Sequence, residues 1–247
     1  MEAKEKSARG NEGSLSELGT ESKWQPNAGK SEESIIGGEL YNEYLGYLLA
    51  GDRRQCANLI TALLERGIDV ADLYLNLFQR SLYRVGELWE FNRITVAMEH
   101  QATAITEGLL SLVYPRLFAR EHRGPLAVIS CIHSEYHQVG GRMVTDLFEL
   151  NGWNGHFLGA NTPIDDLLKF VEDKNPRILG LSLSLYSVLP ELLATLEETR
   201  RRFPDLCILL GGQALRWGSR DFLQDFKDVT YVASYEELNT LLREQSA

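Results

Sequence analysis

Hydrophobic residues in the first half of the chain recur with a helical period. After a polar stretch over residues 1–34, four stripes with an i, i+3/i+4 spacing predict helices joined by short turns. The third stripe ends near Trp89, and Thr95 is placed to cap the fourth helix. We therefore expect an all-α, antiparallel four-helix bundle over residues 35–122.

The polar stretch before the bundle has a different character. Residues 1–34 are rich in Glu, Lys, Ser, Gly and Asn and contain few large apolar side chains. Such a segment cannot bury enough surface to offset the entropy of ordering, so we expect a disordered tail. Its one anchor-like residue is Trp24, which is either a chance aromatic or part of a docking peptide.

After Pro125 the pattern changes to short, continuous apolar runs separated by amphipathic helical stretches. The runs are LAVISC (126–131), HFLG (156–159), ILGLSLS (178–184), LCILLGG (206–212) and VTYVA (229–233). Runs of this kind indicate parallel strands covered on both faces. We expect an α/β Rossmann-like (flavodoxin-like) domain with a five-stranded parallel sheet over residues 124–247. Its ligand should bind beyond the carboxyl ends of the strands, at the loops after the first and third.

Charge and hydropathy narrow the classes of function. The net charge of −10 argues against direct binding to DNA, which requires a basic surface. The basic triplet Arg200-Arg201-Arg202 is more simply explained as the last turn of a helix. The longest largely apolar run, from Ile178 to Leu189, is shorter than the ~20 residues that a membrane helix needs. We expect a cytoplasmic protein without a membrane anchor.

The loop after the first strand contains the candidate chemistry. His137 is a candidate metal ligand, and Glu135 is placed to accept the proton of its second ring nitrogen. Taken alone, a histidine in a loop is more often an ordinary surface residue. The chain lacks a Gly-x-Gly-x-x-Gly after the first strand and a Gly-x-Ser-x-Gly elbow. Dinucleotide binding and a serine nucleophile are therefore disfavoured.

The spacing of three short motifs resembles the signature of cobalamin-binding domains. That signature runs Asp-x-His-x-x-Gly, then Ser-x-Leu, then Gly-Gly. The chain has Glu135-x-His137-x-x-Gly140, 41 residues, Ser182-x-Ser184, 26 residues, and Gly211-Gly212. The resemblance covers residues 126–245, and the bundle before it resembles the cap that accompanies this domain. Glu replaces the usual Asp at the first position, and Ser184 replaces the usual Leu.

This resemblance implies that cobalamin binds with its own base detached from cobalt. His137 would then be the lower axial ligand of cobalt. Ser182 would bond atoms of the cofactor tail, while Gly211 and Gly212 would leave room for it. The two departures from the signature remove no ligand, and Glu135 in place of Asp is typical of cobalamin-dependent photoreceptors.

A second motif lies at the end of the bundle. Trp89, nine residues, and Glu99-His100 resemble the Trp-x9-Glu-His motif of CarH/LitR-type photoreceptors. In that interpretation Trp89 shields the upper axial group of adenosylcobalamin, while Glu99 and His100 bond its ribose or adenine edge. The alternative is a core Trp with a surface Glu-His pair. Those photoreceptors often carry a His after the Trp, but this chain has Glu90, so His100, His133 or water would supply an upper ligand after photolysis.

The family's DNA-binding repressors begin with a winged-helix module of about 70 residues, and the tail of 34 residues is too short for one. We therefore expect a non-enzymatic, light-responsive sensor that signals to a protein partner such as a transcription regulator, as AerR-like antirepressors do. A homo-oligomer and an additional bilin stay open. The alternative is a corrinoid protein that carries a methyl group between two methyltransferases.

Overall fold

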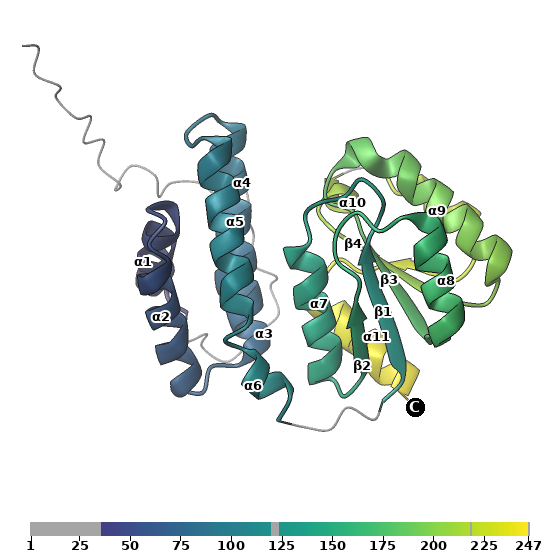
Figure 1. Ribbon diagram of the computed structural model, residues 1–247, viewed down its shortest axis with the longest axis horizontal. Helices are drawn as coiled ribbons and strands as arrows, with labels where there is room; N and C mark the ends of the chain where they lie inside the picture. Colours follow the sequence, from purple (N-terminus) through teal and green to yellow (C-terminus); the bar gives the residue numbers. More distant parts are fainter. Residues whose placement is uncertain (1–35, 120–123, 218, 247) are drawn as a thin grey trace, which may run out of the picture.

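The computed structural model describes residues 36–119, 124–217 and 219–246. Its first part is a helical cap that stands beside an α/β domain (Figure 1). The cap contains α1 (Gly38–Leu49), α2 (Arg53–Glu65), α3 (Val70–Asp72), the π-helix η2 (Leu73–Gln79), α4 (Arg80–Glu90), α5 (Val96–Leu110) and α6 (Tyr114–Leu117). The expected tail over residues 1–34, Trp24 included, lies outside the described residues. The domain boundaries at 34, 122 and 124 stay predictions.

Side-chain caps fix where the cap helices begin. Asp52 accepts a hydrogen bond from the backbone N–H of Gln55 at 3.1 Å and so starts α2. Thr95 does the same for α5 through the N–H of Met98 at 3.3 Å, as the sequence predicted. These oxygens satisfy backbone donors that the first turn of a helix leaves without partners.

The third predicted helix is interrupted by a π-helical segment, which the periodicity did not predict. The segment η2 lies between α3 and α4, so the chain stays helical from Val70 to Glu90. It contains Tyr74, whose hydroxyl donates a hydrogen bond to Asp146 of the α/β domain at 2.6 Å. A contact across 72 positions of sequence leaves no trace in a local hydrophobic pattern.

The second part of the chain folds into a five-stranded parallel sheet, as predicted, and the strand order is β2-β1-β3-β4-β5. The strands are β1 (Leu126–Cys131), β2 (Asn154–Phe157), β3 (Ile178–Ser182), β4 (Cys207–Gly211) and β5 (Val229–Tyr231). The winding direction reverses between β1 and β3, which places the switch point where the sequence predicted it.

The second strand lies two residues earlier than the sequence predicted. It spans Asn154–Phe157 rather than residues 156–159, and it pairs with the start of β1 through Leu126↔Asn154. Because β2 is an edge strand, backbone pairing defines its first residues, which need not be apolar. Gly159, with φ +89°, takes the chain out of the extended conformation.

Helices cover both faces of the sheet (Figure 1). They are α7 (Val139–Leu150), α8 (Ile164–Lys174), η3 (Tyr186–Val188), α9 (Leu189–Arg202), α10 (Ala214–Trp217), η4 (Asp221–Asp225) and α11 (Tyr235–Ser246). Apolar residues of α7 and α11 share one core with the cap and one sheet face, whereas those of α8 and α9 share a second core with the other face. The cap therefore packs on the α7 side.

The cap also makes two polar contacts with α7 and its N-cap. Gln138 Nε2 donates to Glu107 Oε1 of α5 at 3.0 Å, and Tyr74 donates to the buried Asp146. Since α7 starts directly after the loop that contains His137, the cap is fixed to the same element as the candidate site.

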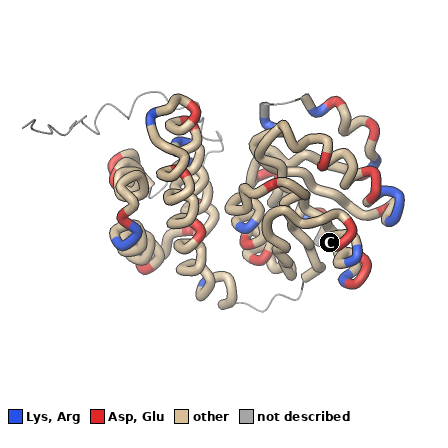
Figure 2. Tube along the Cα trace, turned by 45° about the horizontal axis from the view of Figure 1, so that its top comes forward, with Lys and Arg blue, Asp and Glu red and all other residues tan. Residues whose placement is uncertain are grey.

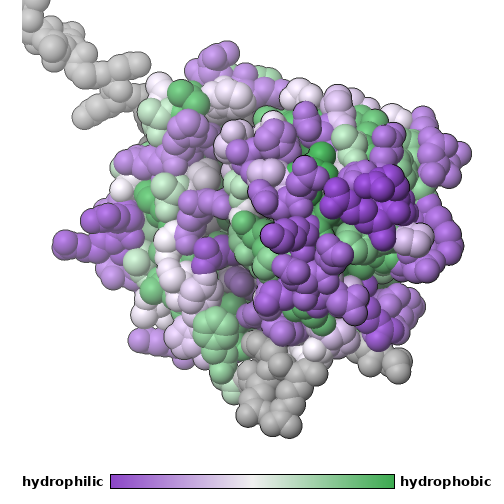
Figure 3. Space-filling model, turned by 45° about the vertical axis from the view of Figure 1, so that its right-hand side comes forward, coloured by the Kyte–Doolittle hydropathy of each residue, from purple (hydrophilic) through white to green (hydrophobic). Residues whose placement is uncertain are grey.

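Charged residues are distributed over both parts of the molecule. Lys and Arg lie among Asp and Glu along the described chain (Figure 2), and the face in Figure 3 is mostly hydrophilic with scattered hydrophobic patches. The triplet Arg200–Arg202 forms the last turn of α9, as predicted, and Arg201 and Arg202 pair with Glu198. Among the described residues, no helix combines the length and apolar character needed to span a membrane.

Candidate functional site

The loop between β1 and α7 lies at the carboxyl edge of the sheet, next to the segment that follows β3. Its two central side chains are Glu135, which is fully buried, and His137, whose side chain is 52% exposed. Strand β1 lies between β2 and β3, so the loops after all three strands meet here. The structure thus places these two candidates where a parallel sheet binds its ligands.

The Glu135 carboxylate joins two loops. Its Oε1 pairs with His137 Nδ1 at 2.6 Å and accepts the backbone N–H of His137 at 2.8 Å. Its Oε2 accepts the N–H groups of Ser184 and Leu185 at 2.6 and 3.2 Å. A buried carboxylate with several donors is the arrangement that retains its charge without water.

These contacts shift both groups toward their charged forms. Burial alone raises the pKa of Glu135, but hydrogen bonds from His137 and from Ser184 outweigh it, so the pKa lies below its ordinary value. The hydrogen bond to Glu135 raises the pKa of His137 against an opposing effect of burial, and the charge of Glu99 adds to the increase. The first turn of α5 is therefore within electrostatic reach of the His137 ring.

Glu135 and His137 together offer one nitrogen donor, which suits a metal whose other ligands belong to a cofactor. With Nδ1 engaged by Glu135, His137 has Nε2 for an external ligand, and the carboxylate fixes the ring and increases its basicity. A cofactor that encloses its own metal would need a single further nitrogen donor from the protein. The buried carboxylate and half-exposed imidazole satisfy that requirement.

The remaining motif residues differ in what they contribute. Ser182 is buried at the end of β3, in register with Cys131 and Gly211, and Ser184 holds Glu135 through its backbone. A Cβ at Gly211 would meet nothing within 4 Å. At Gly212, φ is +106° and a Cβ would lie 2.1 Å from the backbone oxygen of Leu183.

The two glycines of the Gly-Gly pair therefore have different explanations. Close packing of the chain against Leu183 is sufficient to require glycine at Gly212. Gly211 has open space beside it, so a ligand has room at this position. Gly140, at the start of α7, also has no atom within 4 Å of where a Cβ would lie.

The cap residues are more exposed. Trp89 lies in the last turn of α4 and is 49% exposed, so it is not a core residue. Glu99 and His100 lie in the first turn of α5, the neighbouring helix. Glu99 accepts the hydroxyl of Thr103 at 3.0 Å, and the His100 side chain is 75% exposed, 3.6 Å from Glu99. Of these residues, Glu99 acts on His137 through its charge, which adds to the raised pKa of that imidazole.

Sequence reasoning missed the loop after β2. The Asn161 side-chain oxygen accepts the backbone N–H of Ser134 at 2.8 Å, and the backbone N–H of Asn161 donates to the Glu135 carbonyl at 2.8 Å. The segment Gly159-Ala160-Asn161-Thr162-Pro163 has the composition of a turn. That composition gives no sign of the contact with another loop.

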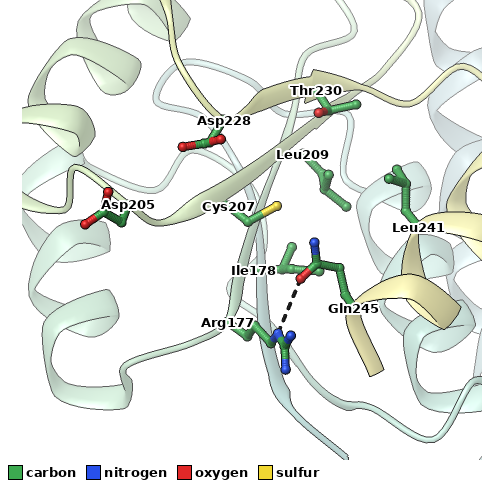
Figure 4. Close-up of a pocket in the computed structure, with 9 residues that line it drawn as sticks. All are labelled: Arg177, Ile178, Asp205, Cys207, Leu209, Asp228, Thr230, Leu241 and Gln245. Atoms are coloured by element: carbon green, nitrogen blue, oxygen red, sulfur yellow. Dashed lines mark hydrogen bonds between the residues drawn. The ribbon is translucent and has the colours of Figure 1, made fainter. Parts of the chain in front are cut away.

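A cavity of about 440 Å³ lies at the other end of the sheet (Figure 4). It is lined by residues at the amino ends of strands, Ile178 and Cys207 among them, and by Leu241 and Gln245 of α11. Parallel sheets bind ligands at the opposite edge, so this cavity is separate from the candidate site.

Comparisons with known proteins agree with the geometry. A model of a B12 binding domain matches residues 125–241, and a second B12 binding domain model matches residues 40–114. The chain is 30% identical over 149 residues to the HTH-type transcriptional repressor CarA of Myxococcus xanthus, and the match covers 59% of this chain. It is 25% identical over 142 residues to methionine synthase of Mycobacterium leprae, a match covering 53% of this chain.

The chain spans only part of these relatives, namely 50% of the repressor and 12% of the synthase. In structure it is similar to a monomethylamine corrinoid protein of Methanosarcina barkeri, with a TM-score of 0.73 and 14% identity. That match covers 85% of this chain and 100% of the other, and it confirms the sheet domain with its helical cap. With both of its folded parts matching B12 binding domains, the chain is a cobalamin-binding protein.

Proposed function

We propose that this protein is a cobalamin-dependent sensor that responds to light and acts through contact with another protein. The observation that carries the proposal is the Glu135–His137 pair, in which a buried carboxylate orients a half-exposed imidazole. The 30% identity over 149 residues to a transcriptional repressor supports a regulatory rather than a catalytic role.

In this proposal the chain divides the work between its two parts. His137 holds cobalt from below, and Glu135 keeps the ring in one tautomer by accepting the Nδ1 proton. Trp89, Glu99 and His100 surround the upper axial group, for which adenosyl is the best candidate. Cobalamin supplies a cobalt–carbon bond that visible light can break.

A light-driven switch requires that the cap has unequal affinity for cobalamin with its adenosyl group and for cobalamin without it. The exposed Trp89 and the partly buried Glu99 are the residues that could make this distinction. The cap is joined to α7 by Gln138 and Asp146, so a change at its tip would alter the surface that both parts present to a partner. A transcription regulator or a second copy of the chain are the partners that we propose.

The match to methionine synthase supports a second candidate, a corrinoid protein that carries methyl groups for separate methyltransferases. Such a carrier needs His137 as well, but it needs no discrimination between the adenosyl form and the form without it. The two candidates therefore differ in what light should do.

The deciding experiment is an absorption spectrum of the purified protein with adenosylcobalamin, before and after green light, followed by size-exclusion chromatography in both states. The sensor predicts stable binding in the dark, a changed spectrum after light, and a change in assembly or in binding to a partner. A spectrum that changes with no change in assembly or partner affinity would favour the methyl carrier.

A further inference from the structure

Two residues with a left-handed backbone face each other next to the candidate site. Ser134 has φ +63° and precedes Glu135, while Asn161 has φ +52° and lies in the loop after β2. The left-handed conformation is unfavourable for most non-glycine residues, and Asn tolerates it better than Ser does. The conformation of Ser134 therefore needs support from its surroundings.

Asn161 supplies that support through two hydrogen bonds on neighbouring residues. The Ser134 N–H donates to Asn161 Oδ1 at 2.8 Å, and the Asn161 N–H donates to the backbone oxygen of Glu135 at 2.8 Å. These two hydrogen bonds hold the backbone of Ser134 and Glu135, which lie just before His137 in the same loop. Within the loop, the Glu135 N–H also donates to Ile132 at 3.1 Å.

The loop that contains Asn161 is itself fixed to the central strand. The backbone oxygen of Gly159 accepts the N–H of Cys131 at 3.0 Å. The Thr162 hydroxyl accepts a hydrogen bond from the Ser130 hydroxyl at 2.9 Å. Asn161 thus lies between two residues that are hydrogen-bonded to β1. These bonds fix its position relative to the sheet, and Asn161 in turn fixes the loop between β1 and α7.

The direction of the Glu135 carboxylate depends on the backbone at Ser134. That carboxylate fixes His137 Nδ1 and is itself held from the other side by the N–H groups that follow β3. A supporting group that is displaced by about 1 Å is enough to impair a functional site.

We infer that Asn161 is a positioning residue for the cobalt ligand. It holds Ser134 in its left-handed conformation, and so keeps Glu135 and His137 in place before the cofactor binds. This inference rests on the proposed function, in which His137 binds cobalt.

Three variants separate the side chain of Asn161 from its backbone. Asn161→Gly keeps the left-handed conformation available but removes the acceptor for Ser134. Asn161→Asp keeps an acceptor at the same place and should restore the wild-type behaviour. Asn175→Gly is the matched control, because Asn175 also has a left-handed backbone, φ +47°, but caps the end of α8.

Two readouts distinguish positioning from general instability. The first is hydrogen exchange of the peptide over residues 132–138 in the protein without cofactor. The second is electron paramagnetic resonance of bound Co(II) cobalamin in protein containing nitrogen-15 histidine, where a doublet splitting reports coordination by His137. Thermal melts of each variant establish that the fold is retained.

For Asn161→Gly we expect faster exchange in this peptide, a weakened doublet and roughly 10–100-fold weaker cobalamin binding, the usual range for residues that support a metal ligand. Asn161→Asp and Asn175→Gly should resemble the wild type in all three. Wild-type values for Asn161→Gly, or equal losses in Asn161→Gly and Asn161→Asp, would overturn the inference while leaving His137 as the ligand. Absence of a doublet from the wild type would overturn the proposed function and this inference with it.

Discussion

The lower side of the candidate site and the cap above it are held in different ways. Below, Glu135 is fully buried and its two carboxylate oxygens accept hydrogen bonds from two loops. Above, Trp89 and His100 are 49% and 75% exposed, and Glu99 is bonded within its own helix. Hydrogen bonds within the fold therefore hold His137 in place without the cofactor. The side chains of Trp89 and His100 are exposed, so their positions depend on the group that they contact. That difference is expected where one side anchors a cofactor and the other detects its state.

Removing the anchor should have the largest effect. His137→Ala deletes the nitrogen proposed as the lower ligand of cobalt, so the bound cofactor should lose its histidine-coordinated spectrum and its affinity should fall more than in any other variant. His100→Ala, which removes an exposed imidazole from the cap, is the control. Equal losses in the two variants would contradict the division between anchor and detector.

The base of the cap offers a test through pH. Burial raises the pKa of Asp146 to about 6, with a smaller increase from Glu149, against the lowering effects of the Tyr74 hydrogen bond and Arg142. Between pH 4 and 6 the folded state then binds more protons than the unfolded state. The contribution of Asp146 to the free energy of unfolding should therefore fall as pH rises through this window, by up to about 3 kcal/mol.

Asp146→Asn isolates that contribution, because it removes the ionisable group and keeps an acceptor for Tyr74. Urea unfolding between pH 4 and 7 should show that the free energy of unfolding of the wild type falls relative to that of this variant as pH rises. Asp205→Asn, which removes an exposed carboxylate far from the cap, is the control. An unchanged slope in Asp146→Asn would contradict the assignment.

Two carboxylates, one on each side of the site, sharpen the comparison further. Glu135→Gln removes the charge that orients His137 and should weaken cobalamin binding by about 10–100-fold. Glu99→Gln, a change of the same size in the cap, should alter the affinity for hydroxocobalamin much less, because Glu99 is proposed to contact the upper group. Isothermal titration of both variants with hydroxocobalamin compares them. Equal effects would show that neither side is prepared in advance.

The smallest effect on binding, but the largest on signalling, is expected for Trp89→Ala. Loss of one aromatic contact of about 1 kcal/mol should reduce the preference for adenosylcobalamin over hydroxocobalamin only a few-fold. Illumination should no longer change assembly or partner binding, as size-exclusion chromatography in dark and light would report. Phe91→Ala, at a second exposed aromatic of the same turn, is the control and should keep the response.

The sequence predicted the sheet, its switch point and the first turn of α5 because each has a local pattern. Continuous apolar runs identified β1 and β3, and Thr95 marked the start of α5. Spacing alone indicated the Glu135–His137 pair, and the structure adds the contacts of Glu135 with the loop after β3.

The features that sequence reasoning missed depend on contacts between distant segments. Asn161 supports Ser134 from 27 positions away, and the π-helix at Tyr74 adjoins Asp146 across 72. The resemblance implied that Gly212 leaves room for the cofactor tail. The structure gives a second reason for glycine there, because a Cβ at this position would clash with the backbone of Leu183. Neither propensity nor periodicity contains such information, since both describe neighbours in sequence.

The central claim is that His137 coordinates cobalt in place of the cofactor's own base. Electron paramagnetic resonance of Co(II) cobalamin bound to protein with nitrogen-15 histidine tests it directly, because only a ligand from the protein carries the heavy isotope. The account predicts a doublet splitting in the wild type and its disappearance in His137→Ala. A triplet in the labelled wild-type protein would mean that the cofactor keeps its own base on cobalt, and would contradict the account.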